Sequence, residues 1–213
     1  HILDDGSLVT AHCANTGAML GVNKEGVTSW LSRSNDPKRK LKWSWELVQI
    51  DKTIIGINTH NPNKIVQEAI QNNKIKELID YSSLKREVKY GTNSKIDILL
   101  QDDSKQDCYV EVKNVHLSRE KGLAEFPDAI TTRGTKHLRE LSLISKSGLR
   151  AVMLYLIQRN DCNFFKIAQD IDKEYAEQFN NAIKAGVEVI CMDTILSDEA
   201  INIGKNIQLL INK

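Results

Sequence analysis

The pattern of apolar and polar residues changes once along this chain, at the segment Asn61-Pro62-Asn63. Before this segment, short stretches with strand-like alternation are separated by turn-forming residues, which is typical of an all-β unit. After it, segments with helical periodicity alternate with strand-like segments, which is typical of an α/β unit. We therefore predict two domains, one covering residues 1–60 and the other covering residues 61–213.

The N-terminal part is predicted to be a small β structure. Strand-like alternation occupies residues 7–13, 27–32 and 46–58. Turn signals stand between them, such as Asp4-Asp5-Gly6 and Asn35-Asp36-Pro37. Several short strands in so short a segment favour a small β barrel or a sandwich.

The C-terminal part is predicted to contain a mixed central sheet covered by helices. A first helix, capped by Asn63, is expected from Lys64 to Asn73 because its apolar residues form one stripe. The further expected elements are strands at 84–90, 95–100 and 108–117, a helix at 131–146, a strand at 150–159, a helix at 174–184 and a strand at 187–192. This order is typical of an α/β layer structure.

Composition excludes several classes of protein. Hydrophobic residues make up 41% of the chain and the formal net charge is +1, so the chain is neither disordered nor uniformly basic. The longest apolar runs are far shorter than the roughly 20 residues of a membrane span, so we expect no membrane partner. The four cysteines lack CxxC spacing, which fits a cytoplasmic protein. Because the chain opens at His1 in strand-like text, we also expect further residues before it.

The sharpest chemical pattern is Asp97, inside an apolar strand, followed by Glu111-Val112-Lys113 in the next strand. Alternation places Glu111 and Lys113 on one face, and Asp97 can reach Glu111 across the hairpin. Two converging carboxylates suit Mg²⁺ or Mn²⁺, and the lysine could stabilise charge on a phosphate. The pattern resembles that of PD-(D/E)xK nucleases, with Glu68 as a candidate third metal ligand. The alternative is a hairpin with an ordinary ion pair.

Two basic groups are candidates for contact with nucleic acid. Arg133, Lys136 and His137 share one face of the predicted helix at 131–146, near its N-terminus. Residues 33–42 hold five basic residues against one acid and are followed by Trp43; cations contact phosphates and rings stack on bases. The candidate residues in this second group are Arg33, Lys38, Arg39, Lys40, Lys42 and Trp43. The alternatives are a solvated helix face and a solvated loop beside core tryptophans.

The chain resembles the sugar fermentation stimulation protein A family essentially from end to end. The segments that carry the resemblance are His12–Gly17, Leu31–Lys40, Val48–Asn63, Ser94–Asp97, Tyr109–Val115, Phe126–Ala129 and Thr132–Leu138. Ala14 departs from the proline usual in the first of them. The resemblance implies an N-terminal OB-like β barrel and a C-terminal nuclease-like α/β domain. It matches Asp97, Glu111 and Lys113 to the family's nuclease-type motif, and Glu68 less closely.

Two functions follow as hypotheses. The resemblance implies a DNA-binding protein without sequence specificity, and a regulator of maltose metabolism. The alternative is a Mg²⁺- or Mn²⁺-dependent nuclease in which Asp97, Glu111 and Glu68 hold the metal ion. The sequence leaves open whether the site is catalytically active, and whether the partner is single- or double-stranded.

Overall fold

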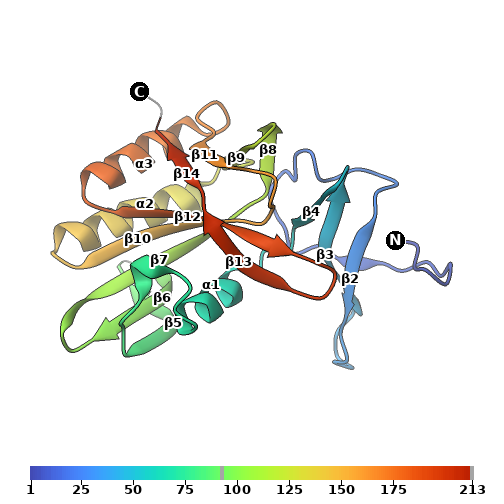
Figure 1. Ribbon diagram of the computed structural model, residues 1–213, viewed down its shortest axis with the longest axis horizontal. Coiled ribbons are helices and arrows are strands. Elements are labelled where there is room, and N and C mark those ends of the chain that lie inside the picture. The colour runs from blue at the N-terminus through green and yellow to red at the C-terminus, as the bar shows by residue number, and fades with distance from the viewer. Residues whose placement is uncertain (92–93, 212–213) are drawn as a thin grey trace.

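The computed structural model describes residues 1–91 and 94–211, which form three β-sheets and three α-helices (Figure 1). The N-terminal sheet consists of β1 (Ala11–His12), β2 (Ser29–Arg33), β3 (Trp43–Ile50) and β4 (Thr53–Gly56). β3 lies at its centre, where β1 pairs with it in parallel and β2 and β4 pair with it in antiparallel fashion. The predicted segment 46–58 is thus the end of one strand and all of the next, divided at Asp51, which has a positive φ of 54°.

The N-terminal sheet does not close into a barrel. Its strand order is β1-β3-β2 with β4 paired to β3, so among the described residues no ladder joins β2 to the opposite edge. The predicted strand 7–13 shrinks to β1, because residues 1–9 bond to one another instead. The N–H of Leu3 donates to the carbonyl of Ser7, and the N–H of Val9 to that of His1. The prediction of a small OB-like β barrel is therefore corrected in one respect, because the sheet is open.

The C-terminal part is built on a six-stranded mixed sheet with the order β13-β12-β10-β7-β6-β5. Its strands are β5 (Ser83–Tyr90), β6 (Ser94–Asp102), β7 (Lys105–Val115), β10 (Arg150–Ile157), β12 (Glu188–Leu196) and β13 (Ile201–Asn206). β10 runs parallel to both β7 and β12, and the outer pairs are antiparallel. The continuous apolar run of β10 is explained by this central position, because both of its faces are covered.

Helices cover both faces of the central sheet (Figure 1). They are α1 (Pro62–Gln71), α2 (Thr132–Lys146) and α3 (Lys173–Lys184), with a 3₁₀ turn η1 (Lys76–Leu78) after α1. Leu154 of β10 packs in the core beneath α1, whereas Tyr155 packs in the core beneath α2 and α3. Within the described ranges, no helix combines the length and apolar character needed to cross a membrane.

A third sheet was not predicted from the sequence. It contains β8 (Leu117–Glu120), β9 (Leu123–Phe126), β11 (Phe164–Ile167) and β14 (Gln208–Leu210), in the order β14-β11-β9-β8. Each strand has only three or four residues, which is too short for a periodic pattern to be recognised. This sheet extends the hydrophobic layer around α3 through Phe165 and Phe126.

Direct contacts join the N-terminal sheet to the C-terminal part. The Gly56 N–H donates to the carbonyl of Gln158 at 2.9 Å, and the Met19 N–H donates to Asp128 Oδ2 at 3.0 Å. The Gln158 side chain is fully buried against Gly56, where a Cβ atom would come within 2.4 Å of its Oε1. These contacts hold the β-sheet of the first part beside α1 and β10 of the second.

Candidate functional site

Asp97 lies where the ladder between β6 and β7 ends. The last paired residues there are Ile98 and Val110, so the next inward N–H of β7, that of Val112, has no carbonyl partner on β6. Asp97 Oδ2 accepts that N–H at 2.9 Å. Its other oxygen accepts a hydrogen bond from Asn63 Nδ2 of α1 at 2.8 Å. The carboxylate is therefore held in one orientation by a strand and a helix.

Glu111 and Lys113 of β7 share the sheet face that α2 covers, as the alternation of the strand predicts. Lys113 Nζ donates to Glu111 Oε1 at 2.6 Å. His137 of α2 contacts the same carboxylate oxygen through Nδ1, and this nitrogen lies 3.2 Å from Lys113 Nζ. The Glu111 side chain is only 2% exposed, so this pairing takes place inside the protein.

The two carboxylates have opposite electrostatic environments. Burial, followed by repulsion from Glu111, raises the pKa of Asp97 above its ordinary value. Burial also acts to raise the pKa of Glu111, but Lys113 and His137 outweigh it and hold that pKa below its ordinary value. Glu111 is thus the carboxylate that stays ionised most readily, while Asp97 gains from any added positive charge nearby.

The donor set of this cluster fits a hard divalent cation in one respect. Glu111 Oε2 is buried and has no hydrogen-bond partner, and carboxylate oxygens are the ligands that Mg²⁺ and Mn²⁺ prefer. In the part of the chain that the structure describes, however, no three His, Cys, Asp or Glu side chains are arranged to hold a metal ion. Further ligands would have to come from backbone carbonyls, water or a phosphate.

Glu68 does not join the cluster. It is exposed on α1 and lines a small hollow beside Ile201 and Ile203 of β13. The α1 side chain that reaches Asp97 is Asn63, which the sequence analysis assigned to the helix cap. α1 instead begins two residues earlier, with Asn61 at its N-cap and Pro62 in its first turn. Residues at helix positions 63 and 68 differ by about 140° around the axis, so one helix cannot direct both towards Asp97.

The predicted basic face of α2 divides into an inner and an outer part. His137 is buried and belongs to the Glu111 cluster, so it is not a solvated surface residue. Arg133 is exposed and donates through Nε to His137 Nε2 at 3.4 Å, and Lys136 is exposed with its ammonium 3.8 Å from Glu140 Oε1. Of the three predicted residues, Arg133 and Lys136 are therefore the two that can meet a ligand from outside.

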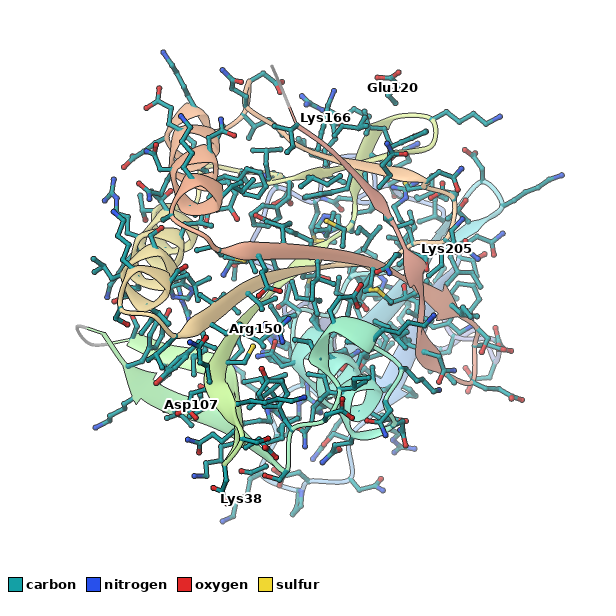
Figure 2. The ribbon with its side chains drawn as sticks, turned by 60° about the vertical axis from the view of Figure 1, so that its left-hand side comes forward. Lys38, Asp107, Glu120, Arg150, Lys166 and Lys205 are labelled. Atoms are coloured by element: carbon teal, nitrogen blue, oxygen red, sulfur yellow. The ribbon has the colours of Figure 1, made fainter. Side chains whose placement is uncertain are left out.

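The predicted basic loop between β2 and β3 also divides. Lys42 Nζ donates to the carbonyls of Asp36 and Pro37, so it closes the loop on itself. The Arg33 guanidinium lies over the Trp43 ring, 5.8 Å from its centroid. Lys38 is exposed at the outer edge of the molecule (Figure 2).

Arg39 and Lys40, from the same loop, face a cleft in front of α1. Trp43 lines an open cavity of about 1070 Å³, which Trp30, Trp45 and residues 1–5 also border. This cavity lies in the N-terminal sheet, apart from the Asp97–Glu111 cluster. Trp45 additionally packs against the core of that sheet, as expected for one of two tryptophans on one strand face.

Comparisons with known proteins agree over both parts of the chain. Residues 1–57 match a family model described as the SfsA N-terminal OB domain, and residues 60–200 match one described as the sugar fermentation stimulation protein RE domain. Curated relatives include a sugar fermentation stimulation protein homolog of Paramagnetospirillum magneticum, 53% identical over 94% of this chain and 85% of the relative. Another, from Rhodospirillum centenum, is 50% identical over 98% of this chain and 89% of the relative.

A solved structure has the same fold. The structure of Pyrococcus furiosus SfsA in complex with Ca²⁺ superposes with a TM-score of 0.87, covering 97% of this chain and 88% of that chain at 24% sequence identity. Its architecture is therefore shared by the described residues from the N-terminal sheet to β14. Together with the two family models and the close relatives, this shows that the chain belongs to the sugar fermentation stimulation protein (SfsA) family.

Proposed function

We propose that this protein binds DNA without sequence preference, and that the Asp97–Glu111–Lys113 cluster hydrolyses phosphodiester bonds with the help of a divalent cation. The observation that carries the proposal is that two carboxylates of neighbouring strands lie close enough for Glu111 to repel Asp97, with the Lys113 ammonium hydrogen-bonded to Glu111. Such an arrangement suits phosphoryl chemistry, in which a cation and a lysine stabilise negative charge.

DNA binding is supported by exposed cations on two sides of the molecule. Lys38 and Lys40 lie in the loop before β3, and Arg133 lies on α2. Such cations contact phosphates, so the logarithm of the binding constant should fall linearly with the logarithm of the salt concentration. Fluorescence anisotropy with unrelated DNA sequences at several salt concentrations tests this. A weak salt dependence, or a strong preference for one sequence, would contradict it.

A PD-(D/E)xK type of domain is part of the same proposal. Its support is the order α1, β5, β6, β7, α2 and β10, with the acid on β6 and the Glu-x-Lys pair on β7. The complex of Pyrococcus furiosus SfsA with Ca²⁺ adds support for a divalent cation. Mg²⁺ and Mn²⁺ are the cations proposed here, because they are hard cations that bind the same oxygen ligands and commonly assist phosphoryl transfer.

Each residue of the cluster has a distinct task in this proposal. Asp97 and Glu111 would hold the cation through their carboxylate oxygens. When bound, the cation would lower the pKa of a water molecule and neutralise phosphate charge. Lys113 would donate a hydrogen bond to the phosphate oxygen on which negative charge develops. His137 fixes the Glu111 carboxylate from the side of α2, and Asn63 fixes Asp97 from the side of α1.

The test is cleavage of labelled single- and double-stranded DNA with Mn²⁺ or Mg²⁺. Glu111→Gln should abolish metal-dependent cleavage, and Lys113→Ala should lower its rate by about a hundredfold. Glu68→Gln is the matched control, because Glu68 is exposed away from the cluster and its loss should leave the rate unchanged. If the wild-type protein binds DNA but shows no metal-dependent cleavage, only the DNA-binding part of the proposal stands.

A further inference from the structure

A polar cleft of about 660 Å³ opens between the N-terminal sheet and the first turn of α1. The basic side chains that line it are Arg39 and Lys40 of the basic loop and Lys64 of α1, together with His12 of β1 and His60. They come from distant parts of the sequence, and only Arg39 and Lys40 were predicted from the sequence to contact nucleic acid. The one acid in its wall is Glu46 of β3.

The positive charge of this cleft is not neutralised by neighbouring carboxylates. Among the described residues, Arg39, Lys40 and Lys64 form no ion pair, whereas elsewhere Arg119, Arg150 and Arg159 all do. Within the described part of the chain, the Arg39 guanidinium donates only to the Ser44 hydroxyl, at 2.6 Å.

The carboxylate of Glu46 is taken up by neutral donors. It accepts hydrogen bonds from Ser32 Oγ at 2.6 Å, Asn58 Nδ2 at 2.8 Å and Asn61 Nδ2 at 2.9 Å. These bonds hold the wall of the cleft in shape, and the lysine ammonium groups remain available for an anion.

The cleft and the Asp97 cluster share the first turn of α1. Asn61 and Lys64 lie in the cleft wall, and Asn63 between them donates to Asp97 Oδ1 at 2.8 Å. Because Asn61 and Asn63 lie about 160° apart around the helix axis, a strand lying in the cleft would have to cross the first turn of α1 to reach Asp97. Glu46 ties this turn to the N-terminal sheet through Asn61, so both parts of the protein shape the route.

We infer that this cleft binds one strand of nucleic acid, with Arg39, Lys40 and Lys64 on its phosphates, and leads it to the Asp97–Glu111–Lys113 cluster. The inference rests on the proposed function and deepens it. A volume of about 660 Å³ lies in the range of pockets that hold a small ligand, so it accommodates a nucleotide or two but not a duplex. His12 and His60 add ring N–H donors at the walls.

The experiment compares two charge-matched double variants of the full chain. Lys40→Ala/Lys64→Ala removes two exposed cations from the cleft, and Lys52→Ala/Lys184→Ala removes two exposed cations that lie outside it and outside the predicted basic groups. Binding is measured by anisotropy, without divalent cations, on an oligothymidylate of about ten nucleotides and on a DNA duplex of the same length. Thermal unfolding of each variant checks that the fold is retained.

The expected result is that the cleft variant binds the single strand about tenfold more weakly. Its logarithmic salt slope should also be smaller by about 1.4, corresponding to about 0.7 for each lost phosphate contact. The control variant should stay within about twofold of the wild type, and duplex binding should change less than single-strand binding in the cleft variant.

Three outcomes would overturn the inference. If both double variants weaken binding equally, general charge and not the cleft binds the strand, and the proposed DNA binding stands. If the cleft variant weakens duplex and single-strand binding alike, the cleft does not select one strand. If the wild-type protein binds neither probe, the proposed function fails together with the inference.

Discussion

At the scale of single residues, Glu111 is held between competing interactions. Burial opposes its charge, while Lys113 and His137 favour it on one oxygen and leave the other oxygen without a partner. A buried acceptor without a partner costs free energy, and a bound ion is one of the explanations for such a group. The free oxygen of Glu111 is therefore consistent with the proposed divalent cation.

Asn63 offers a test of how Asp97 is positioned. Asn63→Ala removes the donor to Asp97 Oδ1, so the carboxylate loses one of the two bonds that orient it. Loss of such an outer contact typically costs tenfold or more in metal affinity or activity, and we expect about a tenfold weaker Mn²⁺ affinity by calorimetry. Gln67→Ala on the same helix is the control, since Gln67 only accepts from Arg86 at the surface. Equal affinities in the two variants would contradict a positioning role for Asn63.

At the scale of secondary-structure elements, Asp172 joins two helices. Its Oδ1 accepts the Tyr175 N–H and so caps α3, while its Oδ2 accepts the Thr131 N–H just before α2. Thr131 in turn caps α2 by accepting the Gly134 N–H. The N-terminal turn of α2 presents Arg133 and His137, so this relay of caps fixes one side of the candidate site.

Asp172→Ala should therefore cost more stability than the loss of an ordinary cap. An N-cap replaced by alanine costs about 1 kcal/mol, and here the half-buried Thr131 N–H also loses its acceptor, which adds about 1–3 kcal/mol. We expect the free energy of unfolding to fall by about 2–4 kcal/mol for Asp172→Ala and by about 1 kcal/mol for Thr131→Ala, measured by urea titration. Equal losses would show that Asp172 serves α3 alone.

At the scale of the whole molecule, Asp128 connects the two parts of the chain. It accepts the Met19 N–H, and His116 Nε2 lies 3.4 Å from its Oδ2. The turn 14–17 approaches so closely that a Cβ atom on Gly17 would come within 2.5 Å of the carboxylate. Thr59 Oγ1 also donates to the Ala14 carbonyl, which ties this turn to the segment before α1.

Gly17→Ala should destabilise the junction by overpacking, at a cost of about 1–3 kcal/mol. Because the clash is with the Asp128 side chain, the double variant Gly17→Ala/Asp128→Ala should lose less free energy of unfolding than the sum of the single variants. Urea unfolding of all four proteins gives this coupling free energy. If the losses of unfolding free energy are strictly additive, an alanine at position 17 does not clash with the Asp128 side chain.

The same carboxylate gives a pH dependence. Burial opposes ionisation of Asp128, but His116 and the Met19 N–H hold its pKa below the ordinary value. Its stabilisation is therefore present above the ordinary pKa of about 4 and is lost as the pH falls through the lower, folded-state pKa. The stability difference between wild type and Asp128→Asn should be about 1–2 kcal/mol near neutral pH and should shrink below about pH 4. A difference that grows on acidification would contradict this.

The sequence predicted the elements that bear strong periodicity and missed those defined by long-range pairing. The strands around Asp97 and Glu111, and the helix with His137, lie within a few residues of their predicted bounds. The sheet of β8, β9, β11 and β14 was missed because its short strands acquire a partner only in the fold. Glu68 was predicted from the resemblance to the nuclease pattern, whereas Asn63 was assigned to the helix cap, and sequence predicts cap positions only to within a few residues.

By itself, the sequence determined the change from β to α/β structure near residue 60, the family, and the shared face of Glu111 and Lys113, since period-two alternation is a local property of a strand. Only the tertiary structure decided that the ladder ends at Ile98, so that Asp97 turns to the Val112 N–H. It also decided that His137 faces inward and that Lys40 and Lys64 meet in one cleft. The physical reason is that contacts between distant segments depend on packing and register, which no local pattern encodes.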